Sequence, residues 1–338
     1  MRHLIYVLLM LLVAGCTAAV ETAQTVRPDQ LSFPELKFAF PVVEKQQLDN
    51  GMKLYVKEDH ELPLIDMTLM IGGGSIEDPA DKTGISLLFA KALETGGAGE
   101  LSPSELEAEL EAMAAELTVS SSTYHYAVNL SLHQQDLQRG IEILGDMLRR
   151  PRFEKERLEL ARKQILEAIR RKNDDPSAVA DRILNQALYQ QHPFGRTPEV
   201  EQVEHFSQDD LQQMQRRFLQ PDNIWFAVSG AVELKQLTAL LDQNFADWQT
   251  TYQYKLTLPP LPPAPDGSVL VVEKAIPQTV IKIGQAGISK DNPDLFALRI
   301  ANYILGGGGF NSRMMREIRS NRGLAYSDNP YSTVGRWL

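Results

Sequence analysis

The sequence of 338 residues has a single cysteine, no apolar run long enough to cross a bilayer, and fewer basic than acidic side chains. One cysteine, Cys16, excludes an intrachain disulfide framework. The 34 lysines and arginines face 44 aspartates and glutamates, which gives a net charge of −10. Because phosphate binding needs clustered basic side chains, we expect no nucleic-acid partner. The hydrophobic fraction of 43% and the charged fraction of 23% are those of a folded globular protein.

The N-terminal residues are typical of an exported protein. Two basic residues precede an apolar run over residues 4–14, which is too short to span a bilayer. Small residues directly before Cys16 resemble a bacterial lipobox, so we predict a signal peptide over residues 1–15 and acylation of Cys16. Simple cleavage nearby, after Ala18 or Ala19, is the alternative.

A lipid on Cys16 would anchor the chain to a membrane, facing the periplasm. Thr17 follows the cysteine in place of an aspartate, and in lipoproteins this generally favours the outer membrane over retention in the inner membrane. Residues 16–43 are largely polar and lack a sustained period, so they are predicted to form a tether.

Two folded regions are predicted beyond the tether. Residues 44–257 mix antiparallel strand pairs with helices, which indicates an α+β domain and not a doubly wound sheet. Residues 258–267 contain five prolines, a composition that predicts a semi-rigid linker and a domain boundary. Residues 268–338 are few for a domain of this kind, so the second domain is expected to be incomplete.

Local patterns predict the elements of both regions. Asn50-Gly51 predicts a hairpin with a type I′ turn, and Ser102-Pro103 predicts a capped helix whose apolar side continues to Leu117. Further strands are expected over residues 63–71, 118–132, 224–228, 269–273, 279–285 and 324–327. Further helices are expected from residue 85 to 92 and over residues 137–148, 153–171, 178–189, 207–218, 234–245 and 294–305, with another from about residue 311.

Several motifs in a fixed order resemble the insulinase/pitrilysin (M16) family of zinc peptidases. They include Leu48-Asp49-Asn50-Gly51-Met52, Gly72-Gly73-Gly74-Ser75, His192-Pro193-Phe194-Gly195-Arg196 and Arg322-Gly323-Leu324-Ala325-Tyr326-Ser327. Each motif is weak alone, but their order and spacing cover nearly everything after residue 44. The resemblance implies insulinase-like domains, with mainly antiparallel sheets flanked by helices.

The helix that binds zinc in this family has lost its ligands here. The family carries His-x-x-Glu-His on a helix after a glycine, and the matching positions hold Leu87, Ala90 and Lys91. Zinc needs thiolate, imidazole or carboxylate ligands, and a protonated lysine repels the cation. The purely structural interpretation is that these three residues form a helix face that packs against the protein, with the lysine side chain directed outward.

The family's third ligand, a glutamate on a later helix, falls on Ala168. A shift of one residue would recover Glu167, but one carboxylate cannot hold zinc and activate its water without the other ligands and the general base. We therefore expect no cofactor in this chain, and the resemblance implies that zinc is bound by a partner subunit.

Other metal or nucleotide sites are not expected. His125 and His133 bracket a predicted strand but have no third ligand, and His192 lies in a loop motif of the family. The glycine tract over residues 306–309 lacks the Gly-Lys-Ser/Thr ending of a phosphate loop, so it is better explained as a loop that lets another backbone approach closely.

Arg322 and Tyr326 are the candidate substrate-binding residues. In two-chain members of the family, the non-catalytic subunit keeps this arginine and tyrosine, and the pair hydrogen-bonds a substrate carbonyl near the scissile bond. A guanidinium and a phenol suit that task because both donate hydrogen bonds to an oxygen that gains negative charge. The structural alternative is that Arg322 complements a helix C-terminus while Tyr326 packs in a strand.

The resemblance thus implies a non-catalytic, substrate-binding subunit of a heterodimeric periplasmic zinc peptidase. Its expected partners are a subunit with an intact His-x-x-Glu-His helix, a peptide or unfolded protein, and a membrane reached through the lipid anchor. The alternative is a catalytically inactive peptide-binding or scaffold protein of the cell envelope, and a self-sufficient zinc enzyme is disfavoured by every missing ligand.

Overall fold

The computed structural model describes residues 39–263 and 265–326, and residues 43–338 form the unit to which the described elements belong. Cys16 and the predicted signal peptide lie outside the described residues, as does most of the predicted tether. Within the described part of the chain, no helix is both long and apolar enough to cross a membrane.

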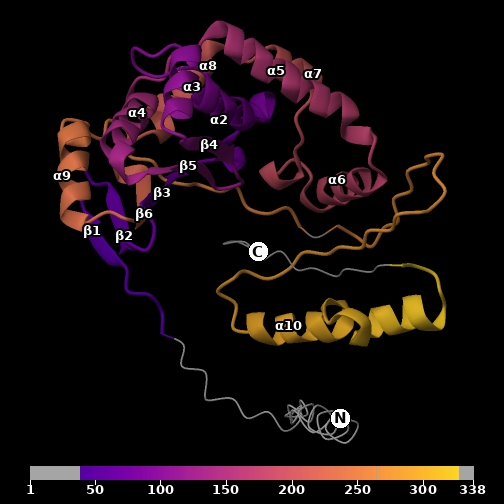
Figure 1. Cartoon of the computed structure of the whole chain (residues 1–338). Helices are drawn as coiled ribbons and strands as arrows, with labels where there is room; N and C mark the ends of the chain where they lie inside the picture. The colour runs from indigo at the N-terminus through magenta and orange to yellow at the C-terminus, as the bar shows by residue number, and fades with distance from the viewer. Residues whose placement is uncertain (1–38, 264, 327–338) are drawn as a thin grey trace, which may run out of the picture. The chain divides into compact units, whose positions relative to one another are not determined.

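One sheet of six strands organises the fold (Figure 1). Its order is β1-β2-β6-β3-β5-β4, and only the β2–β6 pair is parallel among its five pairings. The strands are β1 (Glu44–Gln47), β2 (Lys53–Glu58), β3 (Leu64–Gly72), β4 (Glu116–Ser121), β5 (His125–His133) and β6 (Ile224–Gly230). The expected α+β fold with a mainly antiparallel sheet is therefore confirmed.

Nine α-helices accompany the sheet in the described residues. They are α2 (Ile85–Thr95), α3 (Pro103–Ala112), α4 (Leu137–Arg149), α5 (Lys155–Arg170), α6 (Pro176–Tyr189), α7 (Val200–Glu204), α8 (Gln208–Phe218), α9 (Leu234–Phe245) and α10 (Leu295–Asn302). Ser102 and Glu105 cap α3 reciprocally, as the sequence predicts. The helix ends at Ala112, however, and Leu117 belongs to β4, so the predicted continuation of its apolar side was wrong.

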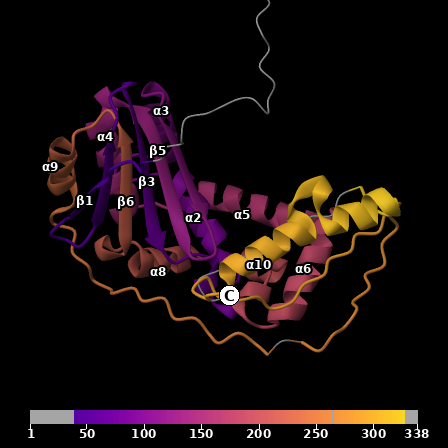
Figure 2. The same ribbon diagram turned by 90° about the horizontal axis from the view of Figure 1, so that it is seen from below.

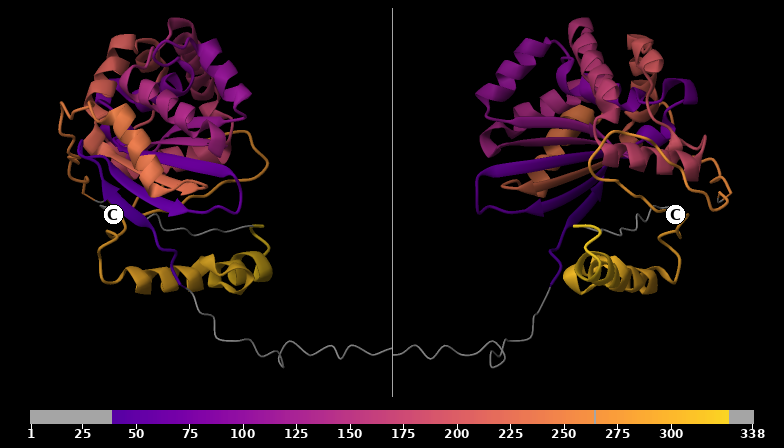
Figure 3. Two further views of the ribbon diagram at one scale, coloured as in Figure 1. Left: turned by 60° about the vertical axis from the view of Figure 1, so that its left-hand side comes forward. Right: turned by 90° about the vertical axis from the view of Figure 1, so that its right-hand side faces the viewer.

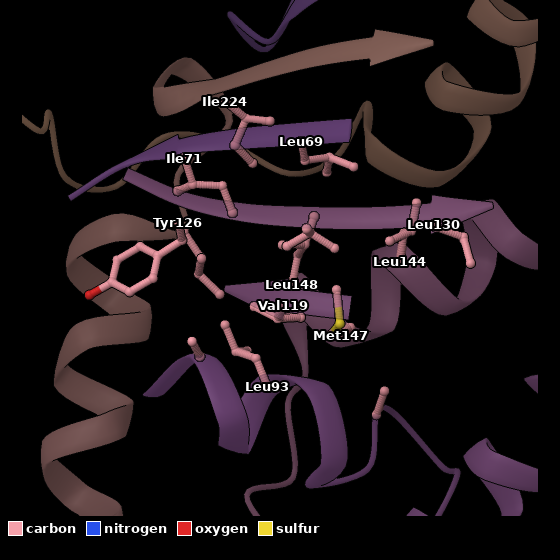
Figure 4. Close-up of a cluster of buried hydrophobic side chains, with 14 of the residues drawn as sticks. Leu69, Ile71, Leu93, Val119, Tyr126, Leu130, Leu144, Met147, Leu148 and Ile224 are labelled. Atoms are coloured by element: carbon pink, nitrogen blue, oxygen red, sulfur yellow. The ribbon is translucent and has the colours of Figure 1, made fainter. Parts of the chain in front are cut away.

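The hydrophobic core lies between one face of the sheet and the helices α2, α4 and α8 (Figures 1 and 2). Figure 3 shows the strands below these helices. Alternate residues of the strands point into the core, and Figure 4 shows side chains from β3, β4 and β5 meeting those of α2 and α4. On the opposite face, Tyr55, Met70 and Trp225 remain partly exposed.

The β1–β2 hairpin does not use the predicted type I′ turn. Gly51 has a φ of 94°, but Asn50 is not among the residues with positive φ. The N–H of Gly51 donates to the Leu48 carbonyl at 2.9 Å, which describes a three-residue loop ending in a left-handed glycine. The buried Asn50 amide donates to the Phe245 carbonyl at 2.9 Å, so this side chain joins the hairpin to the end of α9.

The region after the proline-rich linker has helices but no strand in the residues described. The strands predicted over 269–273 and 279–285 are absent, and so is strand structure over 324–326; Ser327 lies outside the described residues. Strands need a neighbour that accepts their backbone hydrogen bonds, and no described segment supplies one here. The predicted helix over 294–305 is present as α10 and continues as a π-helical turn over Tyr303–Gly307.

Hydrogen bonds from Arg162 connect α5 to the segment around α7. Its buried guanidinium donates to the carbonyls of Val203 at 2.5 Å and Phe206 at 2.7 Å. These carbonyls lie at the end of α7 and just beyond it, where helical acceptors lack intrahelical partners. One side chain therefore satisfies acceptors that burial would otherwise leave unpaired.

We expect Arg162→Met to lower the free energy of unfolding by about 2–4 kcal/mol, because it leaves buried carbonyls without donors. Urea unfolding followed by circular dichroism measures the change. Lys163→Met is the matched control, since Lys163 is the exposed neighbour on the same helix and its loss should cost little. Equal stabilities of the two variants would contradict the role given to Arg162.

Candidate functional site

The helix that would carry zinc, α2, is buried on one side and open on the other. Leu88, Phe89 and Leu93 are fully buried in the core. Leu87 is 44% exposed and lies on the outward stripe with Lys91, one turn further along. Ala90, at the position of the family's catalytic glutamate, is 4% exposed and packs inward. The expected packing face is therefore confirmed for Ala90 but not for Leu87.

Lys91 is held by an ion pair and does not simply extend into solvent. Its Nζ lies 2.6 Å from Glu94 Oε1, one turn along the helix. The second oxygen of the same carboxylate accepts a hydrogen bond from the backbone N–H of Val119, at 3.1 Å. Lys91, at the position of the family's second histidine, is thereby linked through Glu94 to β4, one of the two edge strands of the sheet.

The position of the third zinc ligand lies on α5, a helix that packs against α2. Ala168 and Glu167 are both exposed there. The Glu167 carboxylate is 3.9 Å from Arg170 on its own helix. Leu87, Ala90 and Ala168 have no ligand atom and Lys91 is cationic, so this set does not fit zinc. No group of three His, Cys, Asp or Glu side chains able to hold a metal ion occurs within the described residues.

The histidines of the described residues do not form a metal site either. His125 and His133 occupy opposite ends of β5, and that separation is too long for both to bind one ion. His192 is buried beside Phe194, whose N–H donates to its Nδ1 at 3.2 Å. Burial lowers the pKa of His192, and its place in the loop is structural, as the sequence suggests.

A buried carboxylate that sequence reasoning missed positions the start of α2. Asp78 precedes the helix and accepts hydrogen bonds from the N–H of Gly84 at 2.7 Å and from Ser86 N–H at 3.2 Å. Burial raises the pKa of Asp78 to about 7, although these hydrogen bonds act in the opposite direction. Nothing in the local sequence marks Asp78, because its burial depends on segments distant along the chain.

Next to Asp78, a small pocket of about 120 Å³ is lined by charged residues of two segments. Lys82 donates to Asp210 at 2.5 Å, and Glu77 is paired with Arg217 and accepts from the Tyr254 hydroxyl at 3.0 Å. The hydrogen bond to Asp210 raises the pKa of Lys82. These pairs connect α8 to the segment before α2.

Arg322 and Tyr326 lie at the end of the described chain. The Arg322 Nε donates to Glu317 Oε1 at 2.8 Å, and both side chains are exposed. Arg319 lies over the ring of the exposed Tyr326, with its Cζ 4.3 Å from the ring centroid. Gly323 has a φ of 60°, so the predicted left-handed cap is confirmed. No contact between Arg322 and Tyr326, or of either with α2, occurs in the part of the chain that the structure describes.

Comparison with known proteins identifies the family. The model described as "Insulinase (Peptidase family M16)" matches residues 55–199, and the one described as "Peptidase M16 inactive domain" matches residues 205–336. The chain belongs to the M16 insulinase-like family, and it is a homologue without the zinc-binding residues.

Individual relatives agree with this assignment. The non-peptidase homologue YmxG of Helicobacter pylori is 28% identical over 277 residues, covering 80% of this chain and 62% of that protein. Subunit 1 of the mitochondrial cytochrome b-c1 complex of Bos taurus is 26% identical over 270 residues, covering 79% and 56%. The chain thus spans less than two thirds of the length of these relatives.

A solved structure supports the fold. The M16 inactive domain from Pseudomonas fluorescens superposes with a TM-score of 0.72 at 21% identity, covering 85% of this chain and 69% of that one. Only part of a complete two-domain fold is therefore covered by this chain.

The raised pKa of Asp78 predicts a specific dependence of stability on pH. Between the ordinary aspartate pKa of 3.8, which applies to the unfolded chain, and the folded pKa of about 7, the native state holds a proton that the unfolded state has released. The free energy of unfolding should therefore fall as pH rises through this window, by up to about 1.4 kcal/mol per pH unit from this group. Asp78→Asn cannot titrate and should remove this component.

Urea unfolding of both proteins at pH 5, 6 and 7 tests the prediction, because the stability difference between them must change with pH. Asp81→Asn is the control, since Asp81 is an exposed carboxyl on the same segment. A difference between the wild type and Asp78→Asn that stays constant from pH 5 to 7 would refute the effect of burial.

Proposed function

We propose that the chain is a non-catalytic, substrate-binding subunit of a heterodimeric zinc peptidase of the cell envelope. One observation carries the proposal. The helix that binds zinc in this family, α2, is folded but has no zinc-binding side chains, and the chain retains Arg322 and Tyr326 with exposed side chains. Zinc and the general base would belong to a partner chain with the His-x-x-Glu-His helix. This subunit would supply peptide-binding surface and hydrogen-bond donors.

The exposed edge of the sheet supports peptide binding by strand addition. β4 is an edge strand next to α2, so an extended peptide can extend the sheet along it. Val119 directs its N–H away from β5, since this group bonds Glu94. Backbone alternation then directs the N–H groups of Leu117 and Ser121 outward as well. A peptide bound here would lie beside the outward stripe of α2.

The chemistry of Arg322 and Tyr326 supports their role near the scissile bond. Arg322 is a permanent cation with several donors, and its exposed partner Glu317 can exchange for a substrate oxygen at little cost. Tyr326 can donate its hydroxyl hydrogen to a carbonyl or a developing oxyanion. Both residues would act on a peptide held against the zinc of the partner chain.

Assembly and location rest on separate observations. One relative is by its name a subunit of a multi-chain complex, the cytochrome b-c1 complex. The signal-like N-terminus and Cys16 support export and a lipid anchor facing the periplasm, with the outer membrane favoured. The second candidate function, an inactive peptide-binding or scaffold protein, is favoured by the complete loss of zinc ligands and disfavoured by the retained Arg322 and Tyr326.

The natural protein purified gently from its own envelope should bring down a stoichiometric partner with an intact His-x-x-Glu-His helix, identified by mass spectrometry. In the reconstituted pair, we expect Arg322→Ala and Tyr326→Phe each to lower kcat/KM by roughly 10- to 100-fold, as the loss of a transition-state donor does. Arg316→Ala is the control, because Arg316 is an exposed arginine of the same helical segment. Unchanged turnover in both site variants would leave the scaffold function.

Strand addition is tested separately by Ser121→Pro. Proline removes an outward N–H without breaking the ladder to β5, so the fold should survive while the edge is blocked. We expect the affinity for a fluorescein-labelled extended peptide of alternating threonine and valine, with a lysine at each end, to fall about tenfold. Ser121→Ala keeps the N–H and should bind like the wild type. Equal affinities of the proline and alanine variants would show that the peptide binds elsewhere.

A further inference from the structure

The middle of the β4 edge is already occupied by a side chain of the protein itself. Among the described residues, Glu94 is the one side chain that accepts a hydrogen bond from a backbone N–H of β4, and its partner is Val119 at 3.1 Å. Leu117 and Ser121 flank Val119 with their N–H groups directed to the same side. A peptide that added a strand to β4 would need the N–H of Val119, because it is the central donor of the three.

The carboxylate is fixed in this position from the helix. Lys91 Nζ is 2.6 Å from Glu94 Oε1, and the Lys91 carbonyl accepts from the Thr95 hydroxyl at 2.9 Å. The Glu94 side chain is only 21% exposed, so water screens both of its interactions less than it would on an open surface. Lys91 thus holds one carboxylate oxygen while β4 holds the other.

We propose that the Lys91–Glu94 pair is an internal competitor for the β4 edge, an autoinhibitory contact that a bound peptide must displace. The inference rests on the proposed peptide binding along β4 and adds how that edge is controlled. A carboxylate accepts from an amide more strongly than the peptide carbonyl that would replace it, so displacement lowers the affinity of every extended peptide irrespective of its sequence. The outward N–H groups of Leu117 and Ser121 remain available for the first hydrogen bonds to a peptide.

This arrangement also gives a structural role to Lys91, which lies at the position of the family's second zinc-binding histidine. A neutral histidine in that place would not attract Glu94, whereas the ammonium group of Lys91 pairs with it at one helical turn. The same residue that excludes zinc therefore places a carboxylate on the edge where a peptide would bind. Both effects follow from one positive charge on the outward stripe of α2.

The test measures binding of the same fluorescein-labelled threonine–valine peptide to full-length variants. Glu94→Ala frees the N–H of Val119 and should raise the affinity about three- to tenfold, because one competing hydrogen bond is removed. Glu94→Gln keeps an oxygen acceptor but loses the ion pair, so its gain should be smaller. Glu116→Ala is the charge-matched control, since Glu116 is an exposed carboxylate on β4 itself, and its affinity should equal that of the wild type.

Amide hydrogen exchange gives a second readout that needs no peptide. The N–H of Val119 should exchange faster in Glu94→Ala than in Glu116→Ala, while the N–H of Val128 on β5 should stay unchanged in both. Faster exchange at Val119 together with a gain in affinity supports the proposal. Unchanged exchange at Val119 in a folded Glu94→Ala protein would overturn it.

The outcomes separate this inference from the proposed function. If Ser121→Pro weakens peptide binding but Glu94→Ala gives no gain over Glu116→Ala, peptide binding at β4 stands and the autoinhibitory contact is refuted. If neither the wild type nor Glu94→Ala binds the peptide, both are refuted, because the open edge should then have bound it. A gain in Glu116→Ala equal to that in Glu94→Ala would assign the effect to net charge and also refute the contact.

Discussion

The burial of one side of α2 between the sheet and α5 is the constraint on which the rest of the fold depends. Leu88, Phe89 and Leu93 have no exposed surface, and each side chain of this size stabilises the folded state by about 1.5–3 kcal/mol when buried. This apolar side fixes where the helix lies, whichever residues occupy its other side. An M16 chain can therefore lose its zinc ligands and keep the helix, because metal binding and packing use different faces of it.

The sequence predicts those elements whose causes are local. Strand β3 and the reciprocal cap of α3 follow from neighbouring residues, and both are present, whereas the strand predicted over residues 118–132 is two strands, β4 and β5, joined by a turn. The failures come from interactions between distant segments. Leu117 fits a helical period but belongs to β4, where it pairs with Leu130 of β5. Asn50 fits a type I′ turn, yet its side chain is bonded to the carbonyl of Phe245, a residue far along the chain.

In the region after the proline-rich linker, predictions also failed where they depended on contacts between segments. Val269, Val271 and Ile283 give that region a strong strand pattern, but all three are exposed and no strand forms among the region's described residues. A helix satisfies its hydrogen bonds within one segment, so α10 forms without a neighbour. A strand cannot do so, which explains why the helical prediction was right in this region while the strand predictions were wrong.

In the candidate site, too, some features can be predicted from the sequence motif and others depend on contacts that only the fold creates. The loss of two zinc ligands, at Leu87 and Lys91, and of the general base, at Ala90, can be predicted from the sequence alone. The neighbours that respond to that loss cannot, because a lysine in place of a neutral ligand needs a counter-charge, and which carboxylate supplies it depends on the fold. Glu94 lies one turn from Lys91 and accepts a hydrogen bond from the Val119 N–H of β4. The same carboxylate therefore neutralises the lysine and occupies one hydrogen-bond donor of the sheet edge. A ligand position that becomes cationic therefore acquires new partners, and those partners change the surface that remains available for binding.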